Sequence, residues 1–449
     1  MSKINVDTID KQSGSTVTVG GPGTNLVLGT SGQSVTLGTG ATQSGFGRTG
    51  TVNWCTTAKT SPLTVASGNG YFINTTGGAV TVTLPSSPSA GDIVAFKDYA
   101  NTWDTNGVTV GRGGSKINGI AACANLDTES QSVTLIYVDG TKGWQDIQDS
   151  TSGITGNAFI AATGGTITQC GNDKIHTFTS SGTFTVIKAA CSAANNAVAY
   201  MVVAGGGYGG TYCAGSAGGA GAGGFREGTT APVVPYTASP LVAPAGITVT
   251  AQGYPITVGA GGTNAPAQQG TPSIFSSITS TGGGRGGNQA HSANSPYAGG
   301  PGGSGGGGNG ECGPAGGSGN TPPVSPSQGN NGGTGKGVPG RAGAGGGGAG
   351  AVGGNGVATQ QGGAGGAGVS TEITGAAVTR AGGGGGQGQT CKAGAGGAGG
   401  GGAAGGPGGT AGNPGTVNTG GGGGAGNSNT GTDGGQGGSG VVIIRYKFQ

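Results

Sequence analysis

The chain has little charge and no long apolar run. Only 18 lysines and arginines and 15 aspartates and glutamates occur in its 449 residues. A charge this sparse and nearly balanced is not suited to steering toward nucleic acid. No stretch of 18 apolar residues is present, so we predict no insertion into a membrane. The opening MSKINVDTIDKQ has no apolar core of a signal peptide, so we predict none.

Metal ligands are also scarce. The seven cysteines are scattered without a CxxC pair, and the only histidines are His176 and His291. We therefore predict no metal site and no cofactor. Free thiols in a protein made in a reducing cytosol are the favoured interpretation of the cysteines. The alternative is a disulfide bridge, either Cys312–Cys391 or Cys170–Cys191.

Catalytic pairs of carboxylates are missing as well. Hydrolysis of a polysaccharide needs two carboxylates that flank one bond. Beyond residue 200 the acids are far apart in sequence and lie in no known catalytic motif: Glu227, Glu311, Glu372 and Asp433. No pairing of a nucleophile with a base is visible either. We predict that the protein is not an enzyme.

Glycine is abundant, with 117 residues that gather in tracts such as GGPGGSGGGG at 299–308. Such tracts lack the side chains that would bury one face of a helix or strand, and glycine loses the most backbone entropy on folding. The tracts are therefore either disordered or stabilised by other backbones packed very close. Stacked polyglycine II helices would satisfy the second condition. Such left-handed helices have about three residues per turn and no internal hydrogen bonds, so their polar groups bond to neighbours.

Strand-forming sequences flank the glycine tracts and favour the folded interpretation. IHTFT at 175–179 and TFTVI at 183–187 surround a Ser-Gly turn and predict a hairpin, followed by a strand at 198–203. The chain ends in VVIIRY at 441–446, an apolar and β-branched strand that a disordered tail would not have. We predict that this terminal strand pairs with the opening strands and closes a glycine-rich domain over residues 171–449.

A nine-residue repeat lies at 14–38, with its glycines at 14, 23 and 32. Each copy predicts a very short strand with two apolar residues on one face, followed by a turn. One copy cannot bury that face, but stacked copies can, in a β-solenoid or in an intertwined fibre of several chains. Three copies are few for a solenoid, so we predict an intertwined homotrimer for the N-terminal segment 1–50.

The sequence predicts a small β-sandwich-like domain at residues 51–149 and a linker at residues 150–170. Short alternating segments are separated by Gly, Pro, Asn or Ser turns: 52–57, 71–74, 80–84, 93–97, 108–111, 133–138 and 144–147. All three tryptophans of the chain lie here, and we expect Trp54, Trp103 and Trp144 to pack in the core. A stacking role on carbohydrate is the alternative for Trp103. The whole chain is thus predicted to be all-β and fibrous.

Polar, aromatic and proline-containing segments interrupt the glycine tracts. Examples are RGGNQAHSANSPYAGG at 285–300, KGVPGR at 336–341 and GQTCK at 388–392. Tight glycine helices need turns, and loops displayed on a rigid scaffold are the usual place for recognition. The alternative is that these segments are spacers. Our candidate binding residues are Tyr208, Tyr212, Phe225, Arg285, His291, Asn294 and Tyr297.

The sequence resembles tail fibre proteins of marine bacteriophages. The resemblance rests on the opening MSKINVDTID, on the middle motifs GDIVAFKDY (91–99) and LIYVDGTKGWQ (135–145), and on HTFTSSGTFTV (176–186), MVVAGGG (201–207) and GGSGVVIIRY (437–446). The glycine half is similar in principle to glycine-rich phage adhesins of the T-even type. In those adhesins, stacked polyglycine II helices carry loops that touch the host receptor.

The resemblance implies a virion tail fibre that is assembled in the host cytoplasm. Its N-terminal segment would attach to phage tail or adaptor proteins, and its glycine-rich tip would bind a polysaccharide or an outer-membrane protein of the host. The alternative is a purely structural fibre that carries a separate adhesin. A secreted glycine-rich protein, such as an ice-binding one, would normally have a signal peptide and is less favoured.

Overall fold

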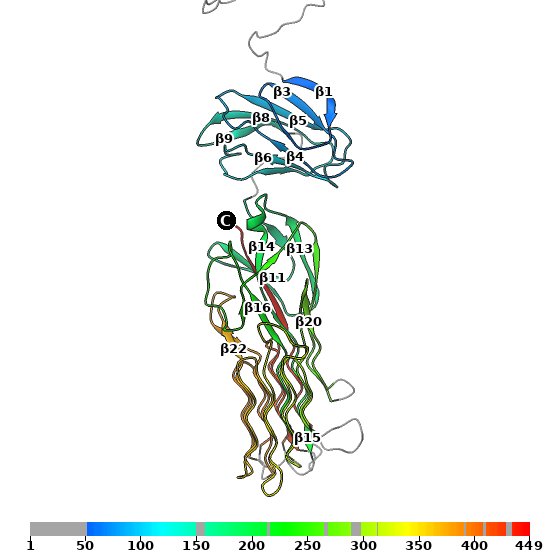
Figure 1. Ribbon diagram of the computed structural model, residues 1–449, viewed down its shortest axis with the longest axis vertical. Coiled ribbons are helices and arrows are strands. Elements are labelled where there is room, and N and C mark those ends of the chain that lie inside the picture. The colour runs from blue at the N-terminus through cyan, green and yellow to red at the C-terminus, as the bar shows by residue number, and fades with distance from the viewer. Residues whose placement is uncertain are drawn as a thin grey trace, which may run out of the picture. The chain divides into compact units, whose positions relative to one another are not determined.

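The computed structural model describes residues 52–149, 158–212, 216–264, 268–288, 298–311, 313–389, 392–406, 410–427 and 433–449. The repeat at 14–38 and the predicted attachment segment 1–50 lie outside these residues. The described chain is all-β, as predicted, and its one helical element is a single 3₁₀ turn, Ala193–Asn196. Figure 1 shows the chain and labels some of its strands.

The middle domain consists of two β-sheets that share one core. The five-stranded sheet contains, in order, β1 (Asn53–Lys59), β3 (Asn69–Ile73), β5 (Ile93–Asp98), β8 (Ser132–Asp139) and β9 (Gly143–Asp149). The four-stranded sheet contains β2 (Leu63–Thr64), β4 (Val80–Thr83), β6 (Val108–Gly111) and β7 (Ala124–Leu126). The chain alternates between the sheets, and strands β1, β3 and β5 are parallel, as are β2, β4 and β6. The chain therefore winds back and forth between the two sheets from β1 to β6, and the domain ends in the antiparallel hairpin β8–β9.

The core between these sheets contains two of the three tryptophans. Trp103 and Trp144 are completely buried, and the Trp103 indole N–H donates to the Ile73 carbonyl at 3.2 Å. Core packing is therefore confirmed for these two, and burial leaves Trp103 no ring face for a sugar. The prediction is wrong for Trp54, which is 40% exposed on the edge strand β1.

The glycine-rich domain also begins with two sheets. One has the order β10 (Ala161–Thr163), β13 (Gly182–Lys188), β19 (Gly253–Thr257), β20 (Ser273–Phe275) and β21 (Ile278–Ser280). The other has the order β11 (Thr166–Cys170), β12 (Asp173–Phe178), β25 (Val441–Lys447), β14 (Ala197–Val203), β16 (Phe225–Gly228) and β17 (Val242–Ala243), with β18 (Ile247–Thr248) paired to β14. Two further strand pairs lie outside these sheets: β22 (Val369–Thr371) with β23 (Val378–Arg380), and β15 (Thr211–Tyr212) with β24 (Gly426–Asn427).

The C-terminal strand pairs with opening strands of the domain, as predicted, and it lies in the interior of its sheet. β25 pairs antiparallel with β12 on one side and β14 on the other. Apolar clusters cover both faces, with Val442 and Ile444 in one cluster and Val441 and Ile443 in the other. A strand buried on both faces has a continuous apolar sequence instead of an alternating one, which explains the run of residues at 441–444.

Two local predictions are wrong. β12 and β13 do not form the predicted hairpin, because the edges of β12 are taken by β11 and β25, whereas β13 pairs with β10 and β19 in the other sheet. Phe178 and Phe184 instead meet in the core between the sheets. The predicted linker 150–170 is also wrong in its second half, which forms β10 and β11.

One disulfide is present among the described cysteines, between Cys123 and Cys191. The favoured prediction of free thiols is therefore wrong for these two residues, and so is the alternative Cys170–Cys191 bridge. Cys170 is free and packs against the apolar cluster that includes Val369 and Ile373. Free thiols are thus found for Cys55 and Cys170 among the described residues. Cys312 and Cys391 lie outside the described residues.

A buried histidine is expected to make the stability of this domain depend on pH. The His176 ring is fully buried, with Nδ1 2.7 Å from the Gly164 carbonyl and Nε2 3.2 Å from the Tyr446 hydroxyl. Burial lowers its pKa from the usual 6.5. The unfolded chain therefore binds a proton at a higher pH than the folded chain, and stability is expected to fall as the pH drops below 6.5. The melting temperature of the parent should fall between pH 8 and 5, and that of the His176→Gln variant should fall less. An equal change of melting temperature with pH in the two proteins would contradict this role of His176.

Candidate functional site: a glycine scaffold and its turns

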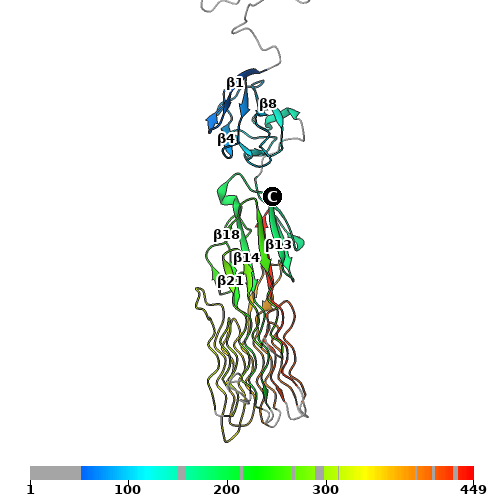
Figure 2. The same cartoon turned by 90° about the vertical axis from the view of Figure 1, so that its right-hand side faces the viewer.

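The glycine segments run side by side between the sheets and the opposite end of their domain (Figures 1 and 2). For example, residues 204–210 continue from β14 away from the sheets, and residues 217–224 return directly into β16. We call these segments the glycine scaffold. The end next to the strands is its sheet end, and the other is its distal end.

The backbone N–H groups of segment 217–224 bond to three neighbours in rotation. Every third residue donates to the same neighbouring segment, and successive acceptors in that segment are three residues apart. The bonds are 218→287, 221→284 and 224→281; 219→344 and 222→347; 220→423 and 223→420. A repeat of three residues indicates a backbone that turns once every three residues, unlike the two-residue repeat of a β-strand.

The carbonyl groups of segment 217–224 point to three further segments. Residues 204, 207 and 210 donate to one set of carbonyls, residues 304 and 307 to a second, and residues 384 and 387 to a third. The three donor segments and the three acceptor segments alternate in a closed ring around 217–224, because each is hydrogen-bonded to the next. The backbone bonds that close the ring include 286→208, 284→304, 344→308, 346→384, 422→382 and 423→207. Segment 217–224 is therefore surrounded on all sides by backbone.

This packing explains the glycine content. A Cβ atom added at Gly219, Gly221 or Gly223 would collide with the carbonyl group of a neighbouring segment. Such atoms are backbone and cannot rotate away. The scaffold thus tolerates alanine only at selected points, such as Ala220 and Ala222, which are completely buried. Larger side chains are confined to its two ends and its outer surface.

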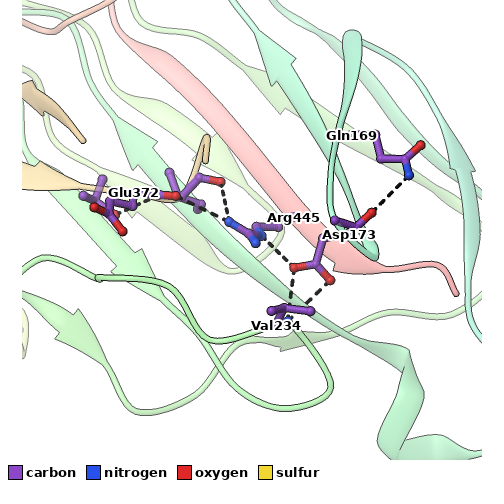
Figure 3. A network of polar contacts seen from close by, with 8 residues as sticks. Gln169, Asp173, Val234, Glu372 and Arg445 are labelled. Carbon is purple, nitrogen blue, oxygen red and sulfur yellow. Dashed lines mark hydrogen bonds and ion pairs between the residues drawn. The ribbon is translucent and has the colours of Figure 1, made fainter. Parts of the chain in front are cut away.

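A buried ion pair joins two neighbouring strands of the larger sheet, β12 and β25 (Figure 3). Arg445 Nε donates to Asp173 Oδ2 at 2.7 Å, and Arg445 Nη1 lies 3.3 Å from the Ile373 carbonyl. Asp173 also accepts the Val234 N–H at 3.1 Å. The exposed fraction is 3% for Arg445 and zero for Asp173, so no ligand reaches either. This pair joins β12 and β25 to the segments beside β22 and is structural.

The predicted binding residues do not form one surface. Tyr208 and Phe225 are only 2% and 1% exposed, and burial raises the pKa of Tyr208 to about 12. Their burial argues against direct contact with a receptor. Arg285 is partly buried, which lowers its pKa, and its Nη1 donates to the Ala298 carbonyl at 3.3 Å. The Tyr212 side chain and the residues His291, Asn294 and Tyr297 lie outside what the structure describes.

Three distal turns lie against one another and form the three-turn cluster, composed of residues 336–342, 357–361 and the described part of 387–393. Backbone hydrogen bonds join the turns: Gln389 N–H donates to the Arg341 carbonyl at 3.1 Å, and Gly362 N–H to the Lys392 carbonyl at 3.0 Å. Gly340 has a φ of +94°, and its Cα faces the Ala358 carbonyl so closely that no Cβ would fit. The first and second turns are therefore in direct contact.

The three-turn cluster displays cations, amides and two apolar side chains. Lys336 and Lys392 are exposed, and Arg341 pairs at 3.0 Å with Glu311 of an adjoining turn. Gln361 Nε2 donates to the Ala393 carbonyl at 2.8 Å, and Lys392 Nζ to the Thr359 carbonyl at 3.3 Å. The exposed apolar residues are Val338 and Val357.

No residue of this cluster is among the binding residues predicted from the sequence. Segments 336–341 and 388–392 were predicted only as interruptions of the glycine tracts, and 357–361 was not predicted as one. The sequence signal was present in the lysines, the arginine and the proline of KGVPGR and GQTCK. It could not show that segments up to about fifty residues apart meet at one end of the scaffold.

Two general features complete the description. No group of three or more histidine, cysteine or acidic residues that could hold a metal ion is found in the described ranges. No helix in the part of the chain that the structure describes has the length and apolar character needed to cross a membrane.

Comparison with known proteins identifies the second half of the chain. The search of curated proteins gives no match. The model of a family described as "Glycine-rich domain" matches residues 178–447, which include the two sheets from Phe178 onward and the whole glycine scaffold. Because the matched residues are more than half of the chain, the protein belongs to this glycine-rich domain family.

Proposed function

We infer that the segments of the glycine scaffold are polyglycine II helices. The observation that supports this is the rotation of hydrogen-bond partners every three residues around segment 217–224. In such a helix the stabilising bonds run between segments, so the scaffold is rigid only as a bundle. A rigid bundle that carries side chains mainly at its ends is suited to presenting them to a partner.

We propose that the protein is a bacteriophage tail fibre that attaches the virion to the host cell surface through distal turns of its glycine-rich domain. The single observation that carries this proposal is the glycine scaffold, which brings polar and cationic turns together at its distal end. The resemblance of the flanking sequence motifs to marine phage fibres supports it. The proposed role is binding, with no catalytic step.

The proposal includes its partners. The N-terminal segment would hold phage tail or adaptor proteins, the fibre would be a homotrimer built on the repeat at 14–38, and the receptor would be a surface polysaccharide or an outer-membrane protein. A purely structural fibre that carries a separate adhesin is the second candidate. The burial of Tyr208 and Phe225 favours it, because it removes two of the expected contacts.

Replacing distal turns is expected to abolish attachment. In one phage variant, the distal turns 337–341 and 358–360 become Gly/Ser segments of equal length, and so does the segment 288–298, which contains the sequence-predicted candidates His291, Asn294 and Tyr297. Adsorption to host cells is expected to fall about a hundredfold or more, because interface binding energy is concentrated in a few side chains. Counting unadsorbed phage after mixing with cells measures this.

The matched control changes exposed side chains at the sheet end. Val352 and Val417 are 57% and 67% exposed there, and the Val352→Ser/Val417→Ser variant is expected to adsorb normally. Both proteins should melt as cooperatively as the parent and keep its mass in light scattering. Normal adsorption of the turn variant would exclude these turns and favour a separate adhesin.

A further inference from the structure

We propose that the three-turn cluster binds an anionic saccharide, a surface glycan whose sugars carry carboxylate or phosphate groups. This inference rests on the proposed attachment function and names its receptor class. Three kinds of observation carry it: the charge of the cluster, the side chains around the charges, and the hydrogen bonds that hold the turns.

The first observation is charge complementarity. The described residues of the cluster include three cations, Lys336, Arg341 and Lys392, and no acid. Glu311 of the adjoining turn pairs with Arg341, so the two exposed lysines keep their charge available. A surface with uncompensated cations attracts anionic ligands and repels cationic ones.

The second observation is the neighbourhood of these charges. Gln360 and Gln389 contact each other at the surface, with Nε2 and Oε1 3.4 Å apart. Gln360 follows Thr359, whose carbonyl accepts a hydrogen bond from Lys392 Nζ, so this pair of amides lies near Lys392. Side-chain amides both donate and accept hydrogen bonds and therefore suit sugar hydroxyls. Val338, at 67% exposure, offers an apolar side chain on the same turn as Lys336 and Arg341. A sugar ring presents hydroxyls at its edge and C–H groups on its faces, which matches this combination.

The third observation is that the backbone of the cluster is held in place before any ligand arrives. Residues Lys336 and Ala342 exchange two backbone hydrogen bonds of 2.8 and 3.0 Å, and Val357 and Gln361 are joined by one of 3.2 Å. The Gln389 and Gly362 bonds then join the turns to each other. A site ordered in advance loses less entropy on binding.

The experiment compares two double variants of the full-length protein. Lys336→Gln/Lys392→Gln removes both exposed charges of the cluster. Lys142→Gln/Lys188→Gln removes two exposed lysines elsewhere and changes the net charge equally. Titration calorimetry measures binding to alginate (carboxylated sugars), to a phosphomannan (phosphorylated sugars) and to neutral dextran. Thermal melts verify that all proteins are folded.

The parent is expected to bind alginate, phosphomannan or both, and not dextran. Lys336→Gln/Lys392→Gln should bind about tenfold or more weakly, and about 0.5 M salt should weaken the parent similarly, because exposed charges are screened. The control variant should bind like the parent. Whether alginate or phosphomannan binds better identifies the anionic group.

Three results would overturn the inference: no binding of the parent to either anionic glycan, unchanged binding by Lys336→Gln/Lys392→Gln, or an equal loss in the control. Phage adsorption then separates this failure from failure of the proposed function. If the turn-replacement phage loses adsorption while phage with Lys336→Gln/Lys392→Gln adsorbs normally, the attachment function stands and the receptor is a protein or a neutral glycan. If the turn-replacement phage adsorbs normally, the attachment function itself is wrong.

Discussion

Replacing Gly306 by valine is expected to lower the free energy of unfolding by about 3 kcal/mol, because overpacking forces backbones apart. Gly306 belongs to the ring of segments around residues 217–224, and a Cβ at this position would collide with the Arg285 carbonyl. Valine adds two further methyl groups at the same point. Chemical denaturation followed by circular dichroism measures the loss.

Amide hydrogen exchange gives a second readout of the Gly306→Val variant. The hydrogen bonds between neighbouring segments protect amides in the parent, and forcing one segment aside should expose its neighbours 217–224 as well. The matched control is Gly406→Ala, where the added Cβ would lie 3.8 Å from the nearest atom, Thr410 Oγ1. That change is expected to stay within about 0.5 kcal/mol of the parent. Fast exchange throughout 217–224 in the parent would show that the scaffold is not packed in this way.

Removing Asp173 is expected to cost about 3–5 kcal/mol, because it leaves a buried arginine without its counter-charge. Arg445 is 3% exposed and has no access to water that could replace the carboxylate. The Asp173→Ala change also leaves the Val234 N–H without its acceptor. Thermal and chemical unfolding of the full-length protein measure the effect.

Two further variants identify its source. Asp127→Ala removes the partner of Lys188, but this pair is about half exposed and 4.0 Å apart, so the expected cost is at most about 1 kcal/mol. Asp173→Leu/Arg445→Met removes both buried charges and is expected to be more stable than Asp173→Ala alone. If Asp173→Ala unfolds like Asp127→Ala, the buried pair does not hold the strands together.

Periodicity and composition in the sequence were sufficient to predict the class of fold. Alternating apolar residues predicted all seven strands proposed for 51–149, and the structure has them as β1, β3, β4, β5, β6, β8 and β9. The β-branched run at 441–444 was recognised as a strand that closes the domain, since such a run is stable only when both of its faces are covered. These features depend on residues close together in the chain.

Pairings between distant residues were not predictable in the same way. IHTFT and TFTVI are strands, but their partners come from β25 and β19, so no hairpin forms between them. Trp54 and Trp103 were both predicted to pack in the core, because both are large apolar residues of the same domain. Trp103 is buried, whereas Trp54 is exposed on an edge strand. Sheet order and edge position are properties of the assembled domain and leave no mark in a short window of sequence.

The sequence by itself determined that much of the second half is glycine and that polar segments interrupt it. Only the tertiary structure decided which interruptions meet. The turns 336–342, 357–361 and the described part of 387–393 come together because each glycine segment crosses the scaffold and reverses. A bare backbone contains no side-chain pattern that specifies its neighbours. Contacts between glycine segments are made by N–H and C=O groups that every residue shares. Their partners are therefore decided by the packing of the whole bundle and by the strands and buried charges that hold its sheet end.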